Sequence, residues 1–238
     1  MLEAVYEDEW SYHEKEIMVC MDSEYLRNKH YDLYLVALIQ GIAGVEDGEK
    51  NATFNMKDAR TTALTNFGFS PYRFRNCMKA MEEIGFISRT EEKNMFEIEP
   101  FAAEGKRFVK VTVGEVHECL LRDLSSFEFK VFLIFRNVQE IKKRKGIRSN
   151  FLFSLKGVLE ECGYTYAEKN RTRLKYSLEK LEEVNVISYN HKSIFKKGRG
   201  KYWALEWAEV RDMNDYGIED TEMQFLKRDP FYGEWHLD

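Results

Sequence analysis

Three clusters of basic residues stand out in the second half of the sequence because each places many hydrogen-bond donors on a short stretch of chain. The first is Arg171, Thr172, Arg173, Lys175 and Tyr176, the second Lys196, Lys197, Arg199 and Lys201, and the third Lys142, Lys143, Arg144 and Lys145. An arginine can bond the edge of a guanine with two donors, and either lysine or arginine can neutralise a phosphate. The clusters therefore predict contact with a polyanion.

Net positive charge is confined to one part of the chain. The whole protein has a net charge of −5 and a pI of about 5.7, which taken alone argues against nucleic acid. Residues 101–207, however, carry 22 basic and 13 acidic side chains, whereas residues 1–27 and 208–238 each have a net charge of −6. A basic segment between acidic ends is typical of a polyanion-binding module with acidic flanks.

The elements that position these residues belong to a sequence that repeats itself once, at an interval of about 100 residues. MKAMEEIGFIS (78–88) matches LEKLEEVNVIS (178–188) in apolar pattern, and four further blocks recur upstream in the same order. In each copy, apolar periodicity predicts a strand, three helices and a closing pair of strands.

The expected elements of the first copy are a strand at 16–21, helices that include 33–38, 55–68 and 70–84, and a hairpin at 86–98. Their counterparts are 108–113, 129–133, 154–163, 170–184 and 186–207. Ser70 and Asn170 are the predicted caps of the third helices. The second hairpin is expected to have a long polar tip from His191 to Lys201, and the third basic cluster is expected between the first and second helices.

Three helices closed by a β-hairpin are the arrangement of a winged helix, in which the second and third helices form a helix-turn-helix. The sequence therefore predicts an α+β, mostly helical protein with two tandem winged-helix domains, 1–103 and 104–207, and an acidic, aromatic tail at 208–238. Helix-turn-helix proteins place base contacts at the start of the third helix. In the second copy that position carries the first basic cluster, and the hairpin, or wing, carries the second.

The first copy has a weaker set of donors. Its hairpin tip contains Glu91 and Glu92, and its third helix aligns Arg73 and Arg75 with two residues of the first basic cluster. We expect this copy either to contact DNA weakly or to serve as a dimer or partner surface. Its candidate DNA-binding residues are Tyr72, Arg73, Arg75 and Lys79.

Two tandem winged helices, each led by a short strand, resemble the plasmid and phage replication initiators built from two such domains. Residues 108–135 are similar to the strand, helix, Leu-Ser and long apolar helix that open winged helices in that group and in related primosome-loading proteins. The resemblance covers about residues 16–207 and lies in architecture and hydrophobic pattern. It implies that the C-terminal domain binds origin repeats in double-stranded DNA, while the N-terminal domain serves homodimerisation or a half-site and replication proteins are further partners.

Two other classes stay open on the same residues. A transcriptional regulator would use the same DNA contacts to repress a nearby promoter, so the sequence does not separate it from an initiator. A protein adaptor would use the winged helices to hold other proteins, and it would show no salt-dependent affinity for DNA.

The remaining residues indicate neither catalysis nor a cofactor. The four cysteines and five histidines lack the spacing of a zinc site, and the phosphate-binding motif GxxxxGK[ST] is absent. The longest apolar run, Leu33 to Ile39, is far shorter than the roughly 20 residues of a membrane span, and the acidic N-terminus is unlike a signal peptide. We therefore expect a cytoplasmic protein that is not an enzyme, with no cofactor, metal ion or membrane partner.

Overall fold

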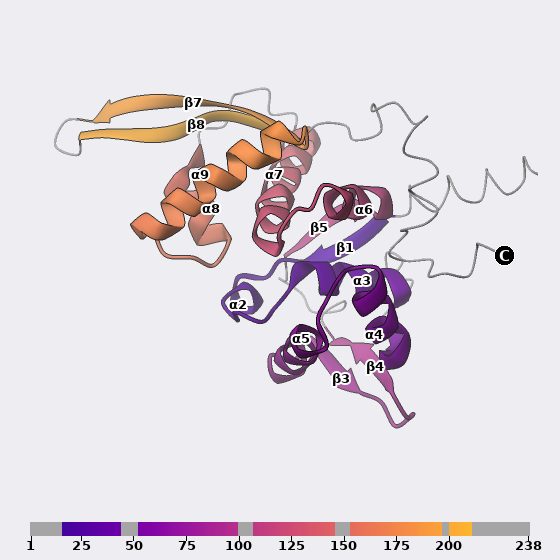
Figure 1. Cartoon of the computed structure of the whole chain (residues 1–238). Helices are drawn as coiled ribbons and strands as arrows, with labels where there is room; N and C mark the ends of the chain where they lie inside the picture. The colour runs from indigo at the N-terminus through magenta and orange to yellow at the C-terminus, as the bar shows by residue number, and fades with distance from the viewer. Residues whose placement is uncertain (1–15, 44–51, 100–106, 146–152, 197–199, 211–238) are drawn as a thin grey trace, which may run out of the picture. The chain divides into compact units, whose positions relative to one another are not determined.

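The computed structural model describes residues 16–43, 52–99, 107–145, 153–196 and 200–210 (Figure 1). These residues form two compact units, which we call unit 1, ending at Leu121, and unit 2, beginning at Arg122. Both combine helices with small antiparallel sheets, and helices make up the larger part. The α+β class predicted from the sequence is confirmed.

Unit 1 contains two small sheets and five helices among its described residues. In chain order its elements are β1 (Glu16–Cys20), α2 (Ser23–Leu26), α3 (Leu33–Ala43), β2 (Thr53–Asn55), α4 (Met56–Thr65), α5 (Pro71–Glu83), β3 (Ile87–Arg89), β4 (Met95–Ile98), β5 (Phe108–Thr112) and α6 (Val113–Leu121). Three strands form an antiparallel sheet in the order β2-β4-β3, and β1 pairs with β5.

Unit 2 repeats the middle of this order, from α3 to β4. Its elements are α7 (Ser126–Lys145), β6 (Phe153–Ser154), α8 (Leu155–Glu161), α9 (Glu168–Glu183), β7 (Ile187–Lys196) and β8 (Gly200–Val210). The sheet order β6-β8-β7 is antiparallel and matches β2-β4-β3 in the other unit. The repeat seen in the sequence is therefore also a repeat of topology, from α3 to β4 and from α7 to β8.

The two leading strands of the repeat pair with each other. Val19 lies opposite Val109 and Ile17 opposite Val111, and all four side chains are buried, as alternating apolar residues predict. Because of this pairing, β5 and α6 belong to unit 1. The compact units therefore divide after Leu121, whereas the repeat places a boundary near residue 103.

The third helices begin differently in the two units. The predicted cap of α5 is confirmed, because Ser70 Oγ accepts a hydrogen bond from the backbone of Arg73 at 3.1 Å and Pro71 follows. The predicted cap of α9 is wrong. Ala167 has the extended backbone of an N-cap, and the Asn170 side chain lies inside the helix and donates to the Thr165 carbonyl at 2.9 Å. The residue before a proline is disfavoured in helical conformation, so Pro71 prevents α5 from starting earlier. No proline restricts the start of α9, so α9 has 16 residues and α5 has 13.

The second hairpin is more regular than predicted. The strands β7 and β8 continue through most of the stretch from His191 to Lys201, which the sequence suggested as a polar tip, and residues 197–199 lie outside the described residues. β8 also extends to Val210, so the first three residues of the predicted tail belong to the sheet. Residues 211–238 of that tail lie outside the described part of the chain.

A capping box fixes the start of α7. The backbone N–H of Ser125 donates to Glu128 Oε2 at 2.6 Å, and Lys180 Nζ of α9 lies 3.2 Å from the same carboxylate oxygen. Burial alone would raise the pKa of Glu128, but the hydrogen bonds from Ser125 and Lys180 outweigh it and hold this pKa below its usual value. Glu128 thus joins the first and third helices of unit 2.

We expect Glu128→Gln to destabilise unit 2 by about 1 kcal/mol near neutral pH, because the amide lacks the charge that strengthens both contacts. A depressed pKa means that the contribution of the carboxylate is present above its ordinary pKa of 4.5 and is lost as the pH falls through the folded-state value. Urea unfolding should therefore show the difference between variant and native chain shrinking between about pH 7 and pH 3.

The matched control is Glu160→Gln, which breaks the exposed Lys156–Glu160 pair at 3.6 Å on α8. Such a pair contributes less than about 1 kcal/mol, so this variant should unfold much like the native chain at both pH values. A loss for Glu128→Gln that is the same at both pH values would contradict the assignment.

Candidate nucleic-acid interface

The outward face of α9 exposes most of the first basic cluster. Thr172, Arg173, Lys175 and Tyr176 are exposed, and 68% of Tyr176 is accessible. The opposite face is anchored in the core of unit 2 by Leu174, Leu178 and Leu181, which are fully buried. The helix is therefore held rigidly from behind while its donors face solvent, as base or phosphate recognition requires.

Arg173 lies on two aromatic rings, Phe127 and Tyr164, which we call the aromatic shelf. Its guanidinium carbon is 4.1 Å from the centre of the Phe127 ring and 5.8 Å from that of Tyr164. The rings meet edge to face at 5.3 Å, and Lys130 Nζ, which donates to the Cys162 carbonyl at 3.3 Å, lies 5.5 Å from the Tyr164 ring. Stacking restrains the plane of the guanidinium and leaves its N–H edge directed away from the rings.

Arg171 has an aromatic neighbour of its own. Its guanidinium carbon is 5.1 Å from the ring centre of Tyr166, which is 41% exposed in the segment before α9. Sequence reasoning missed Tyr166 and the shelf. The only available signal was the pattern Tyr164-Thr165-Tyr166 directly after Gly163, at the turn that leads into the helix.

The order of charges along α9 is opposite to the order that helix stability favours. Its first half carries Lys169, Arg171, Arg173 and Lys175 against one carboxylate, Glu168, and its second half carries Glu179, Glu182 and Glu183 against one cation, Lys180, so the net charge changes from +3 to −2 along the helix. Near the ends of a helix, the reverse arrangement is favoured by about 0.3–1 kcal/mol per charge, because the N-terminus is the positive end of the dipole. Cations and dipole thus combine at the start of α9 into a field that attracts anions.

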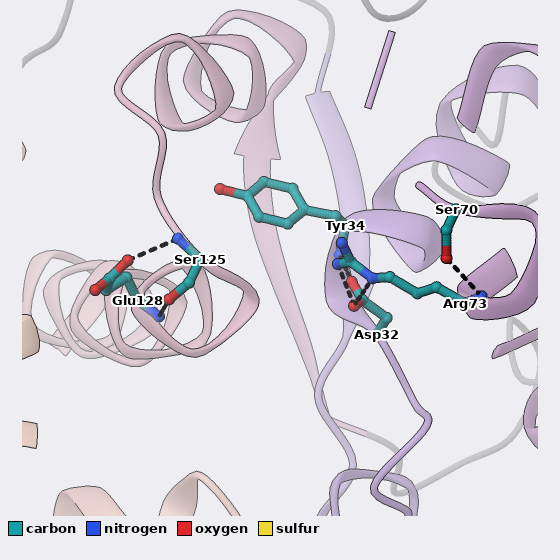
Figure 2. A network of polar contacts seen from close by, with 6 residues as sticks. All are labelled: Asp32, Tyr34, Ser70, Arg73, Ser125 and Glu128. Atoms are coloured by element: carbon teal, nitrogen blue, oxygen red, sulfur yellow. Dashed lines mark hydrogen bonds and ion pairs between the residues drawn. The ribbon is translucent and has the colours of Figure 1, made fainter. Parts of the chain in front are cut away.

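In unit 1 the corresponding arginine is occupied. Arg73 of α5 lies over the Phe69 ring at 3.7 Å, and it donates to Asp32 Oδ2 through Nη2 at 2.6 Å and through Nε at 3.2 Å (Figure 2). Arg75 is exposed on the same helix, and Lys79 forms an exposed pair with Glu83 at 3.5 Å. Tyr72, at the start of α5, is 71% exposed.

The third basic cluster was predicted to lie between the first and second helices. The structure instead places it in the last turn of α7. Basic residues form helix readily and are favoured at a C-terminus by the dipole, so they extend the helix. At about 1.5 Å per residue, Lys142 lies roughly 22 Å along α7 from Phe127. The structure therefore does not bring residues 142–145 to the aromatic shelf.

The second basic cluster lies at the end of the long hairpin. Lys196 is the last residue of β7 and Lys201 lies in β8, whereas Lys197 and Arg199 lie outside the described residues. In Figure 1, the end of β7 and the beginning of α9 lie toward the same side of unit 2. The backbone thus places Lys196 and the first cluster toward one side of this unit.

Metal binding and membrane insertion have no support in the described ranges. No group of three or more His, Cys, Asp or Glu side chains there could hold a metal ion, and the four cysteines are buried thiols. None of the described helices has the length and apolar character needed to span a bilayer.

Comparison with known proteins adds no further constraint. The sequence matches no model of a protein family, and no curated protein matches it. What the chain binds therefore has to be inferred from its own residues.

Proposed function

We propose that each unit is a winged helix and that the protein binds double-stranded DNA sequence-specifically, with α9 as its main recognition helix. One observation carries this proposal: the first half of α9 exposes Arg173, Lys175 and Tyr176, beside the half-buried Arg171, on a helix whose opposite face is buried. Helix-turn-helix proteins insert the corresponding part of the third helix into the major groove.

The residues of this surface suit different tasks. Arg173 is stacked, so its donors are oriented for the edge of a base, where a bidentate contact with guanine discriminates by about 1–3 kcal/mol. Lys169 and Lys175 are exposed lysines on the same helix, and a flexible ammonium suits a phosphate better than a base edge. The basic end of the β7–β8 hairpin would act as the wing and neutralise further phosphates.

The biological role that we propose is replication initiation at a plasmid or phage origin. Its support is the resemblance in order and hydrophobic pattern to initiators with two winged helices. Unit 1, whose third helix has fewer available cations, would then serve a half-site, a homodimer contact or a replication protein. An array of short repeats near the gene, protected by the protein in footprinting, would favour this role over repression of a promoter.

Charge reversal on α9 tests the proposed recognition helix. We expect Arg173→Glu with Lys175→Glu to weaken binding to a selected duplex by about 1–3 kcal/mol for each well-made base contact. Fluorescence anisotropy on the full chain would measure this, with a duplex enriched from a random pool by the native protein. Lys29→Glu with Lys57→Glu, which reverses two exposed lysines of unit 1, is the control for charge alone.

Undiminished affinity of the doubly reversed chain at physiological salt would refute the assignment of α9. A native chain with no salt-dependent affinity for any duplex would instead favour the protein-adaptor class.

The wing is expected to act on phosphates, because its four cations surround Gly198 and Gly200, and cations on a glycine-rich stretch suit phosphate neutralisation better than base reading. Replacing Lys196, Lys197, Arg199 and Lys201 by alanine should lower affinity for selected and random duplexes alike. It should also flatten the log-log salt dependence by roughly two to four units, at about 0.9 for each phosphate met.

The control for the wing variant removes four exposed cations of unit 1, Lys29, Lys57, Arg60 and Lys93. The salt slope should change less in this control. If the wing variant kept its affinity for random duplex but lost sequence preference, the roles of wing and helix would have to be exchanged.

A further inference from the structure

The first helix of the repeat, α3 in unit 1 and α7 in unit 2, begins at a different kind of N-cap in each copy. In unit 1 the cap is Asp32, whose Oδ1 accepts a hydrogen bond from the backbone of Tyr34 at 3.1 Å. In unit 2 the cap is Ser125, whose Oγ accepts from the backbone of Glu128 at 3.4 Å (Figure 2). Each cap carbonyl also accepts the first helical hydrogen bond, so the two residues occupy the same place in the fold.

The charged cap of unit 1 has a second partner. While Oδ1 caps α3, the other oxygen of Asp32 accepts two N–H groups of Arg73, and only 11% of the Asp32 side chain is exposed. A partly buried, two-pronged contact of this kind neutralises the guanidinium and occupies the donors that would bond a base edge. A DNA base would have to displace Asp32 to reach them.

The neutral cap of unit 2 leaves the equivalent arginine without this partner. Arg173 lies next to the start of α7, because it stacks on Phe127, the second residue of that helix. The cap there is a serine, and the nearby carboxylate of Glu128 is engaged by Ser125 N–H and Lys180. Within the described ranges, no ion pair joins Arg173 to a carboxylate.

We propose that the N-cap of α3 in unit 1 and the N-cap of α7 in unit 2 are specificity-determining residues. Asp32 holds Arg73 away from base edges, so unit 1 contributes phosphate contacts, whereas Ser125 leaves Arg173 available to read guanine in the major groove. The inference rests on the proposed DNA-binding function and deepens it, since it names the base class and the residue that permits or blocks its recognition.

A reciprocal exchange of caps tests this inference, because Asp and Ser are about equally good N-caps and both helices should stay capped. The variants are Asp32→Ser and Ser125→Asp in the full chain. The probes are a duplex enriched by the native chain from a randomised pool of about 30 base pairs, and the unselected pool itself. Anisotropy at several salt concentrations gives the ratio of the two affinities.

We expect Ser125→Asp to lower the ratio of selected to random affinity by about tenfold to a hundredfold, the size of one lost bidentate base contact. Affinity for the random pool should fall only severalfold. Asp32→Ser should raise affinity for the random pool severalfold, and a new selection with it should enrich a second guanine-containing motif. Ser125→Asn, a cap without charge, should bind like the native chain.

A measurement without DNA separates this inference from the proposed function. The Nε–H of Arg73 donates to Asp32, so in nitrogen-resolved NMR it should exchange with water more slowly than the Nε–H of Arg173. Ser125→Asp should slow exchange at Arg173, and Asp32→Ser should speed it at Arg73. Glu16→Gln, which removes an equal charge from an exposed pair with Lys110, should change neither.

The outcomes distinguish failure of the cap's role from failure of the proposed function. Native chain that binds duplex DNA, with an unchanged affinity ratio in Ser125→Asp, would overturn the role of the cap and leave the proposed function standing. Native chain that binds no duplex would overturn both, even if the exchange rates respond as expected. Should thermal melting show that Ser125→Asp is unfolded, Arg173→Lys, which keeps the charge but not the fork, must give the same loss of ratio.

Discussion

An arginine lying over an aromatic ring is the contact on which the arrangement of each third helix depends. In both units a glycine with positive φ, Gly68 at 63° or Gly163 at 81°, follows the second helix, and the next residue is aromatic. Glycine adopts this conformation at little cost, so the chain turns and sets the ring beneath the third helix. Arg73 or Arg173 then covers the ring, since a guanidinium is planar and weakly hydrated enough to stack without losing its charge.

If α9 recognises DNA as proposed, the same contact ties stability to recognition. Phe127 is only 3% exposed, so Arg173 protects part of the core of unit 2 while it faces solvent. A cation used in this way needs no carboxylate to hold it, and its donors stay available for an external anion. Where a carboxylate is present, as Asp32 is in unit 1, the arginine is held more firmly, but its charge is neutralised inside the unit.

Features that depend on neighbours in the sequence were predicted well, and features that depend on distant residues were not. Apolar periodicity and Ser70 before proline located the elements of the repeat, because both act within a few residues. Asn170 was wrongly predicted as the cap of α9, because an asparagine is equally compatible with a cap and with a position in a short turn. Residues 142–145 were predicted to lie in a loop because a run of charged residues is compatible with both a loop and a helix. The pairing of Asp32 with Arg73 joins residues 41 positions apart and has no local signal.

The contrast between the units also bears on why a protein would keep both. Two linked binding modules gain affinity because the second contact becomes intramolecular, and this gain does not require that both modules read sequence. In the proposed function, unit 1, with a neutralised arginine but exposed Arg75 and Tyr72, would add phosphate and stacking contacts at any sequence. If it also read bases strongly, off-target sites matching either unit would be bound more tightly. Selectivity for one site is therefore better served when one third-helix arginine is available and the other is held.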